Sequence, residues 1–93
     1  MTDDDEPAFE LTPVLDLHTF RPQEVAELVA DYLDEAVARG WTEVRIVHGK
    51  GTGTLRRIVH AALERHAAVV EFRQADANWG ATLVMLATAT RAP

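Results

Sequence analysis

The chain has 93 residues, which is enough for one modest hydrophobic core and too few for a catalytic domain beside a separate substrate domain. It contains no cysteine, which excludes disulfides and zinc sites built from thiolates and fits a reducing compartment. The first ten residues carry five acidic side chains and no basic one, unlike a signal peptide, and no apolar run is long enough to span a membrane. We therefore expect a cytoplasmic protein without a membrane partner.

The chain begins with an acidic stretch and a short strand. We expect residues 1–12 to form a flexible acidic tail. The segment VLDLH at 14–18 alternates in character as a strand does, so its two leucines should face one way. Asp16 and His18 then face the other way, which places a carboxylate and an imidazole on one side of the strand.

The next segment has the pattern of an amphipathic helix. Pro22 suits its first turn, where a missing N–H costs little, and Gly40 suits the position that ends it. The apolar residues that recur at helical spacing are Val25, Leu28, Val29, Tyr32, Leu33, Ala36 and Val37. Five acidic residues fall off this stripe, so the exposed side of the helix should face away from any nucleic acid.

The second half of the chain predicts a strand, a glycine-rich loop, a helix and two further strands. We expect strands over 42–48, 68–72 and 81–87, and a helix behind the loop that is capped by Thr52 or Thr54. The inner stripe of this helix comprises Leu55, Ile58, Val59, Ala62, Leu63 and His66. The order of elements is β-α-β-α-β-β, an α/β arrangement in which the first two strands are parallel.

The loop VHGKGTG contains three glycines at alternate positions. Gly49, Gly51 and Gly53 would let backbone N–H groups approach a ligand without side-chain clash, and the helix behind them adds the positive end of its dipole. This is the chemistry of holding a phosphate. His48 adds a side chain that titrates near neutral pH, which a simple phosphate cradle does not need.

Basic residues are concentrated around this loop, although the net charge of the chain is -6. Between positions 44 and 73 there are six basic residues and two acidic ones. Arg56 and Arg57 directly follow the loop. We therefore place Thr52, Thr54, Arg56 and Arg57 with the three glycines in a candidate phosphate- or nucleic-acid-binding set.

Parallel strands should bring the two histidines at the strand ends to the edge where ligands bind in open α/β sheets. Neighbouring strands are roughly 4.8 Å apart, so Asp16 could orient His48 as readily as His18. An acid, a base, an orienting carboxylate and a stabilising positive charge are the parts needed to cleave a phosphodiester. The candidate catalytic residues are accordingly Asp16, His18, His48 and Lys50.

Other interpretations of these residues stay open. A histidine at a strand end is more often a hydrogen-bonded structural residue than a catalyst. A dinucleotide-binding fingerprint would require a third glycine at Arg56, and a Walker loop would require Lys50 to follow the last glycine. A metal site of two histidines and one carboxylate is conceivable, but the spacing does not demand it.

Three segments together resemble a known family. The segments LDLH at 15–18, HGKGTG at 48–53 and WGATLVML at 79–86 are similar, in order and spacing, to the small MutS-related domain, or Smr domain. The resemblance implies a two-layer α/β sandwich over a four-stranded mixed sheet. We place this domain at residues 13–88, before a C-terminal tail at 89–93.

One position departs from the family pattern. The first motif of the family usually continues with glycine, and Thr19 stands there in this chain. The Cβ of a threonine resists a positive φ angle or a very close approach of the backbone. If the turn needs either feature, catalysis would suffer.

The resemblance implies binding or endonucleolytic cleavage of DNA or RNA. Family members occur as the C-terminal domain of a MutS paralogue and as free-standing proteins, which this short chain is similar to. His18 and His48 would exchange proton roles while Lys50 stabilises developing charge. RNA could be cut through its own 2′-hydroxyl without metal, whereas DNA would require water and a divalent cation such as Mg²⁺ or Mn²⁺.

Two alternatives belong to other functional classes. The chain could be a nucleic-acid-binding or ribosome-binding module that does not cut, or it could bind a small nucleotide in the glycine loop. The first predicts salt-sensitive binding without products, and the second predicts stronger stabilisation by a mononucleotide than by oligonucleotides. We expect a monomer or a weak oligomer in each case.

Overall fold

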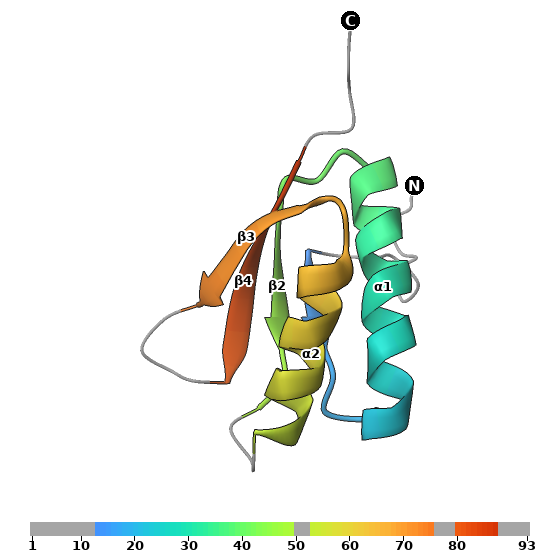
Figure 1. The fold of residues 1–93 in the computed structure, drawn as a ribbon, viewed down its shortest axis with the longest axis vertical. Coiled ribbons are helices and arrows are strands. Elements are labelled where there is room, and N and C mark those ends of the chain that lie inside the picture. The colour runs from blue at the N-terminus through green and yellow to red at the C-terminus, as the bar shows by residue number, and fades with distance from the viewer. Residues whose placement is uncertain (1–12, 50–52, 76–79, 88–93) are drawn as a thin grey trace, which may run out of the picture.

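The computed structural model describes residues 13–49, 53–75 and 80–87 (Figure 1). The elements are β1 (Val14–Asp16), α1 (Pro22–Ala38), β2 (Glu43–Val47), α2 (Thr54–Arg65), β3 (Val69–Gln74) and β4 (Ala81–Leu86). The predicted order β-α-β-α-β-β is therefore confirmed.

The strands form one mixed sheet with both helices on one of its faces. Their order across the sheet is β1-β2-β4-β3, with β1 and β2 parallel and β4 antiparallel to both of its neighbours. Helices α1 and α2 lie side by side in front of the sheet (Figure 1). The architecture is the predicted two-layer α/β sandwich.

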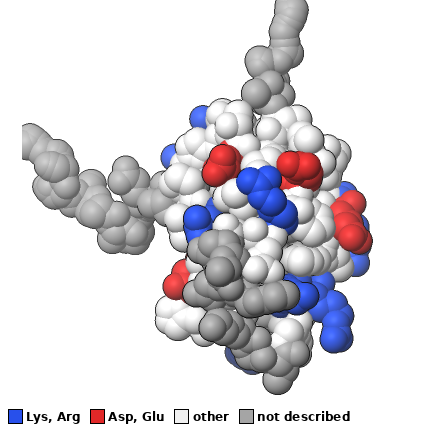
Figure 2. Space-filling view, turned by 90° about the vertical axis from the view of Figure 1, so that its left-hand side faces the viewer, with Lys and Arg blue, Asp and Glu red and all other residues white. Residues whose placement is uncertain are grey.

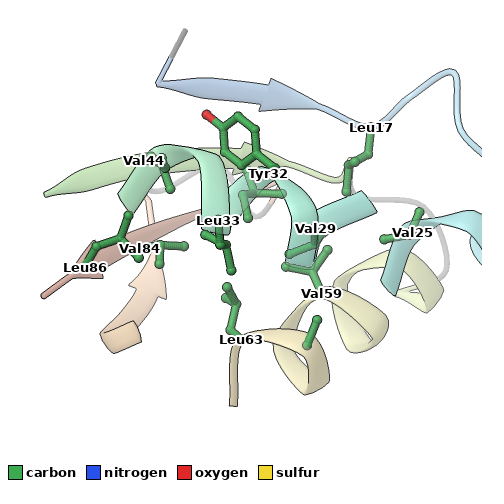
Figure 3. Packing of buried hydrophobic residues seen from close by; sticks show 13 residues of the cluster. Leu17, Val25, Val29, Tyr32, Leu33, Val44, Val59, Leu63, Val84 and Leu86 are labelled. Atoms are coloured by element: carbon green, nitrogen blue, oxygen red, sulfur yellow. The ribbon is translucent and has the colours of Figure 1, made fainter. Parts of the chain in front are cut away.

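The core lies between the helices and the sheet (Figure 3). The buried side chains of α1 are Val25, Val29, Tyr32, Leu33 and Ala36. Every second residue of the central strands faces them, as in Val44 and Ile46 of β2 and Val84 and Leu86 of β4. The residues between them face the opposite side of the sheet. The position of a residue along a strand therefore determines whether its side chain points to the helices or away from them.

The two helices begin and end differently from one another. In α1, the carboxylate of Glu24 accepts a hydrogen bond from the Arg21 backbone N–H at 3.0 Å, and Gly40 follows the last turn with a φ of 81°. In α2, the cap residue is Gly53, with a φ of 90°, and Thr54 is already the first helical residue. The prediction that Thr54 could cap this helix is therefore wrong, and Thr52 lies outside the described residues.

Strands β1 and β2 end just before the two motif histidines. Strand β1 stops at Asp16, although the Leu17 N–H still donates to the Val47 carbonyl at 2.9 Å. His18 lies in the turn that follows, where the Phe20 N–H donates to the Leu17 carbonyl. The predicted strands were therefore slightly too long at their carboxyl ends, and both histidines stand beyond the regular ladder.

Candidate functional site

The carboxyl ends of β1 and β2 and the amino ends of both helices meet at one end of the molecule, the lower end in Figure 1. A hollow of about 320 Å³ lies there. Its lining residues are Pro22, His48, Gly49, Gly53, Thr54, Leu55 and Arg56. Residues from three separate segments thus form one concave surface at the predicted ligand-binding edge.

The charge around this hollow suits an anion. Arg56 lines it, Arg57 is exposed beside it, and the first turn of α2 has no acidic residue. Figure 2 shows Lys and Arg side chains at the lower right of the view, below the acidic side chains on that side. The amino end of α2 adds the partial positive charge of its unpaired N–H groups.

Asp16 and His18 form a hydrogen-bonded pair on the surface. Asp16 Oδ1 accepts from His18 Nδ1 at 2.9 Å and from the His18 backbone N–H at 3.0 Å. The backbone bond, then the ring bond, lower the pKa of the Asp16 carboxyl. The His18 side chain is 75% exposed. Because Nδ1 donates to the carboxylate, the neutral ring presents the lone pair of Nε2 to solvent.

His48 is held inside the domain. It is 6% exposed, its Nδ1 lies 3.1 Å from the Gly49 carbonyl oxygen, and its Nε2 lies 2.9 Å from Thr82 Oγ1. Both ring nitrogens thus have partners within the protein. His48 does not present a free nitrogen to the hollow that it lines.

The two histidines reach the same edge from opposite faces of the sheet. Asp16 pairs with Val47 in the parallel ladder, and the next residue, His48, points to the helix side. Asp16 therefore orients His18, and the expectation that it could orient His48 equally well is wrong. The neighbouring strand was close enough, but the alternation of side chains directs the two groups apart.

The start of the glycine loop is hydrogen-bonded to Gly80, the residue before β4. The backbone N–H groups of His48 and Gly49 both donate to the Gly80 carbonyl, at 2.8 and 2.9 Å. Gly49 has a φ of 80°, which favours glycine there. Its N–H is therefore engaged within the fold and is not offered to a phosphate as the sequence pattern suggested. Lys50, Gly51 and Thr52 lie outside the described residues.

Sequence reasoning missed two residues of this region, His60 and Thr82. His60 Nε2 lies 3.0 Å from Thr82 Oγ1, the same hydroxyl that contacts His48. His60 stands one helical turn after Arg56, and Thr82 occupies an inward position of a strand whose other inward residues are apolar. A polar residue at such a position was the signal that could have identified the contact.

Burial keeps the two inner histidines uncharged. Desolvation is the main cause that lowers the pKa of His48, and the charge of Arg56 adds to it against the Gly49 hydrogen bond. Desolvation also lowers the pKa of His60, helped by Arg56 and His48 and opposed by Glu64. Both rings are therefore neutral at neutral pH.

The described part of the chain has neither a cluster of metal-binding side chains nor a helix suited to crossing a membrane. No three His, Asp or Glu side chains there gather closely enough to hold a metal ion. Within the same residues, neither helix has the length and apolar character that a membrane crossing requires.

Comparison with known proteins identifies the family. A family model for the Smr domain matches residues 15–87. The chain belongs to the Smr domain family. The endonuclease MutS2 of Geobacillus kaustophilus (strain HTA426) is 44% identical over 72 residues, which cover 77% of this chain and 9% of that protein. The endonuclease MutS2 of Pelotomaculum thermopropionicum is 40% identical over 83 residues, or 86% of this chain and 11% of that protein. This Smr domain thus spans about a tenth of the length of these relatives.

Solved Smr structures have the same fold. The Smr domain of Thermus thermophilus MutS2 aligns with a TM-score of 0.74 and 37% identity, covering 78% of this chain and 95% of that one. YdaL, a stand-alone small MutS-related protein from Escherichia coli, aligns with a TM-score of 0.77 and 26% identity, covering 82% of this chain and 65% of that one. In this Smr domain, Thr19 has no positive φ, so its backbone is not strained by the side chain that replaces a glycine.

Proposed function

We propose that this Smr domain binds nucleic acid at the glycine-lined end of its sheet and cleaves a phosphodiester bond there, with His18 as the proton-transfer group. The observation that carries the proposal is the exposed Asp16–His18 pair, with Nδ1 bound 2.9 Å from the carboxylate. Such a pairing fixes the tautomer and stabilises the imidazolium that forms when Nε2 takes a proton.

Binding would use the positive surface at the same end of the domain as this pair. Arg56 and the amino end of α2 attract a phosphate, and Gly53, with a φ of 90°, brings the backbone of the loop into the helix without a side chain. We assign Lys50, Gly51 and Thr52 to the same surface from the sequence pattern, with Arg57 and Thr54 beside them. The endonuclease activity named for the MutS2 relatives agrees with a phosphodiester as ligand.

The proposed cleavage depends on the substrate. On RNA, His18 Nε2 would take the proton of the 2′-hydroxyl as that oxygen attacks the neighbouring phosphorus, while Lys50 would stabilise the charge that develops on the phosphate. The bond from phosphorus to the 5′-oxygen would break, leaving a 2′,3′-cyclic phosphate, and water would protonate the departing 5′-oxygen. On DNA, water would attack, and a divalent cation would be needed to activate it. His48 would take no direct part in the proton transfer because both of its ring nitrogens are engaged within the protein.

The experiment compares single-stranded RNA and supercoiled DNA, each with magnesium and with a chelator, as substrates of the wild type and His18→Ala. His66→Ala is the matched control, because His66 also pairs with an aspartate, at 2.8 Å, but at the other end of the helices. We expect products from the wild type and the control but not from His18→Ala. Equal cleavage by all three proteins would reveal a contaminating nuclease and refute the role of His18.

A second candidate function is binding without cleavage, to nucleic acid or to the ribosome. It is favoured by the internal position of His48, which leaves one exposed histidine in the described part of the site. For binding, we expect the double variant Arg56→Ala/Arg57→Ala to weaken oligonucleotide affinity and to reduce the slope of affinity against salt by about two. Arg65→Ala, at the other end of α2, should change neither. Binding without products would select this function over the nuclease.

A further inference from the structure

A hydrogen-bonded network of polar side chains crosses the otherwise apolar interior behind the glycine loop. His48 and Thr82 are the buried polar side chains of the described residues, and they contact each other at 2.9 Å. His60, half-buried on α2, reaches the same hydroxyl at 3.0 Å. Three residues from β4, α2 and the end of β2 thus share one hydroxyl group.

While both rings are neutral, each hydrogen bond in this network has only one possible donor. The Gly49 carbonyl only accepts, so His48 Nδ1 must carry the proton of that 3.1 Å contact. The neutral ring then has a lone pair on Nε2, which accepts the hydroxyl proton of Thr82. Since that hydroxyl has a single proton, its oxygen must accept from His60 Nε2–H.

Surrounding groups hold both ends of this hydrogen-bonded network. The Phe72 ring lies against the His60 ring, with 4.8 Å between their centroids. At the other end, the backbone N–H groups of His48 and Gly49 both donate to the Gly80 carbonyl. Gly49 is therefore held at its N–H by Gly80, the residue before β4, and at its carbonyl by the His48 ring.

We propose that His60 and Thr82 are positioning residues that hold His48 in its Nδ1–H tautomer and thereby fix the start of the glycine loop. The chain of contacts runs from His60 through Thr82 and His48 to the Gly49 carbonyl. Loss of the hydroxyl would release the His48 ring, and with it the carbonyl that sets the direction in which the loop leaves β2. The proposal rests on the proposed function only in treating this loop as the nucleic-acid site.

Arg56 connects this interior hydrogen-bonded network with the proposed binding surface. It lines the large hollow that contains His48 and also a second cavity, of about 70 Å³, with His60, Gln74 and Thr82. A positive side chain of the proposed binding surface thus also lines a cavity formed by His60 and Thr82. A shift of His60 would alter the smaller cavity, which Arg56 also lines.

The first test reads the tautomer directly. Nitrogen NMR of protein labelled in its histidine rings distinguishes a protonated ring nitrogen from one with a lone pair. At neutral pH we expect the His48 ring of the wild type to carry its proton on Nδ1. In Thr82→Val, which keeps the shape but removes the hydroxyl, we expect a mixture of both tautomers. A His48 ring protonated on Nε2 in the wild type, or an unchanged ring in Thr82→Val, would overturn the proposal.

The second test uses conservative partners to separate positioning from general packing. Thr82→Ser retains the hydroxyl, and His60→Gln retains an N–H donor, whereas Thr82→Val and His60→Leu remove these groups. We expect the affinity for a short single-stranded oligouridine to fall about fivefold in the latter pair, the usual effect of one lost hydrogen bond, and to stay within about twofold in the former. Equal losses in all four variants would contradict the positioning role.

The two tests keep this inference separate from the proposed function. If the wild type binds no oligonucleotide, the proposed function fails. The tautomer of His48 in the wild type and in Thr82→Val still decides whether His60 and Thr82 position the ring.

Discussion

At the scale of single residues, His18 and His48 differ because their ring nitrogens have different partners. His18 has one nitrogen on Asp16 and the other open to solvent, whereas both nitrogens of His48 are bound within the protein. The first arrangement suits proton transfer with a substrate, and the second suits a fixed structure. The hydrogen bonds of the two histidines therefore suit them to different roles.

The Asp16–His18 pair gives a prediction for catalysis. Asp16→Asn keeps a hydrogen-bond acceptor but removes the negative charge that stabilises the imidazolium, so we expect the single-turnover cleavage rate to fall by about a hundredfold. Asp34→Asn is the matched control, because Asp34 pairs with His66 at 2.8 Å at the opposite end of the helices. A similar loss of rate in both variants would show that the effect is not specific to the site.

The sequence allowed part of this site to be predicted. Alternation along the first strand correctly placed Asp16 beside His18, because the period of a strand is a local property. The face of His48 follows the alternation of Val44 and Ile46 in β2, but its level along the sheet relative to Asp16 depends on the register between β1 and β2, which no local pattern specifies. For the same reason, the contact of Thr82 with His48 and His60 could not be derived from spacing alone.

At the scale of elements, the join between the glycine loop and α2 depends on one backbone conformation. Gly53 caps the helix with a φ of 90°, and a Cβ at this position would meet no atom within 4 Å. The space is open, so the cost of a side chain comes from the left-handed conformation itself. The sequence favoured threonine as the cap because its hydroxyl can accept an N–H, but the left-handed backbone at the cap position selects glycine.

This conformation gives a prediction with an internal control. Gly53→Ala and Gly40→Ala introduce the same strain, since Gly40 has a φ of 81° and equally open surroundings. We expect each to lower the free energy of unfolding by about 1 kcal/mol, measured by chemical denaturation. Only Gly53→Ala should also weaken oligonucleotide binding. If Gly40→Ala weakened binding as much, the loss would reflect stability and not the shape of the loop.

At the scale of the whole molecule, the neutral inner histidines make stability depend on pH. Their pKa values in the folded state lie below the usual 6.5, because of burial and of Arg56, with Glu64 opposing the shift at His60. Well above pH 6.5, both rings are unprotonated in the folded and in the unfolded protein, so the free energy of unfolding does not change. Below that pH the unfolded chain takes up protons first, and the folded state loses stability as the pH falls.

We therefore expect the free energy of unfolding to decrease as the pH is lowered from about 7.5 to about 5.5, by at most about 1.4 kcal/mol per pH unit for each histidine, and the thermal midpoint to fall with it. His60→Gln should show a shallower decrease over the same range. The Asp16 carboxyl does not contribute there, because its pKa is lowered from 3.8. A wild-type midpoint that rises on acidification would contradict the neutral state of these rings.

The overall fold was more predictable than the site. The apolar stripes of α1 and α2 and the alternating strands specify the elements, and the parallel pairing of β1 with β2 follows from the helix between them. The boundaries were less accurate, since β3 begins at Val69 and continues to Gln74, past the predicted end at 72. A strand end is set by its partner, and β4 pairs with Gln74 through Thr82.

The outer strands of the sheet also affect how the domain coexists with other chains. Strand β1 has three residues, and β3 carries a bulge between Val69 and Glu71 and an ion pair of Glu71 with Arg73 at 3.7 Å. Short length, bulges and charges at an outer strand all discourage the addition of a foreign strand. Outer strands of this kind resist pairing between the sheets of two molecules. A domain with such edges is therefore suited to a place within a much longer polypeptide, where it would not promote aggregation.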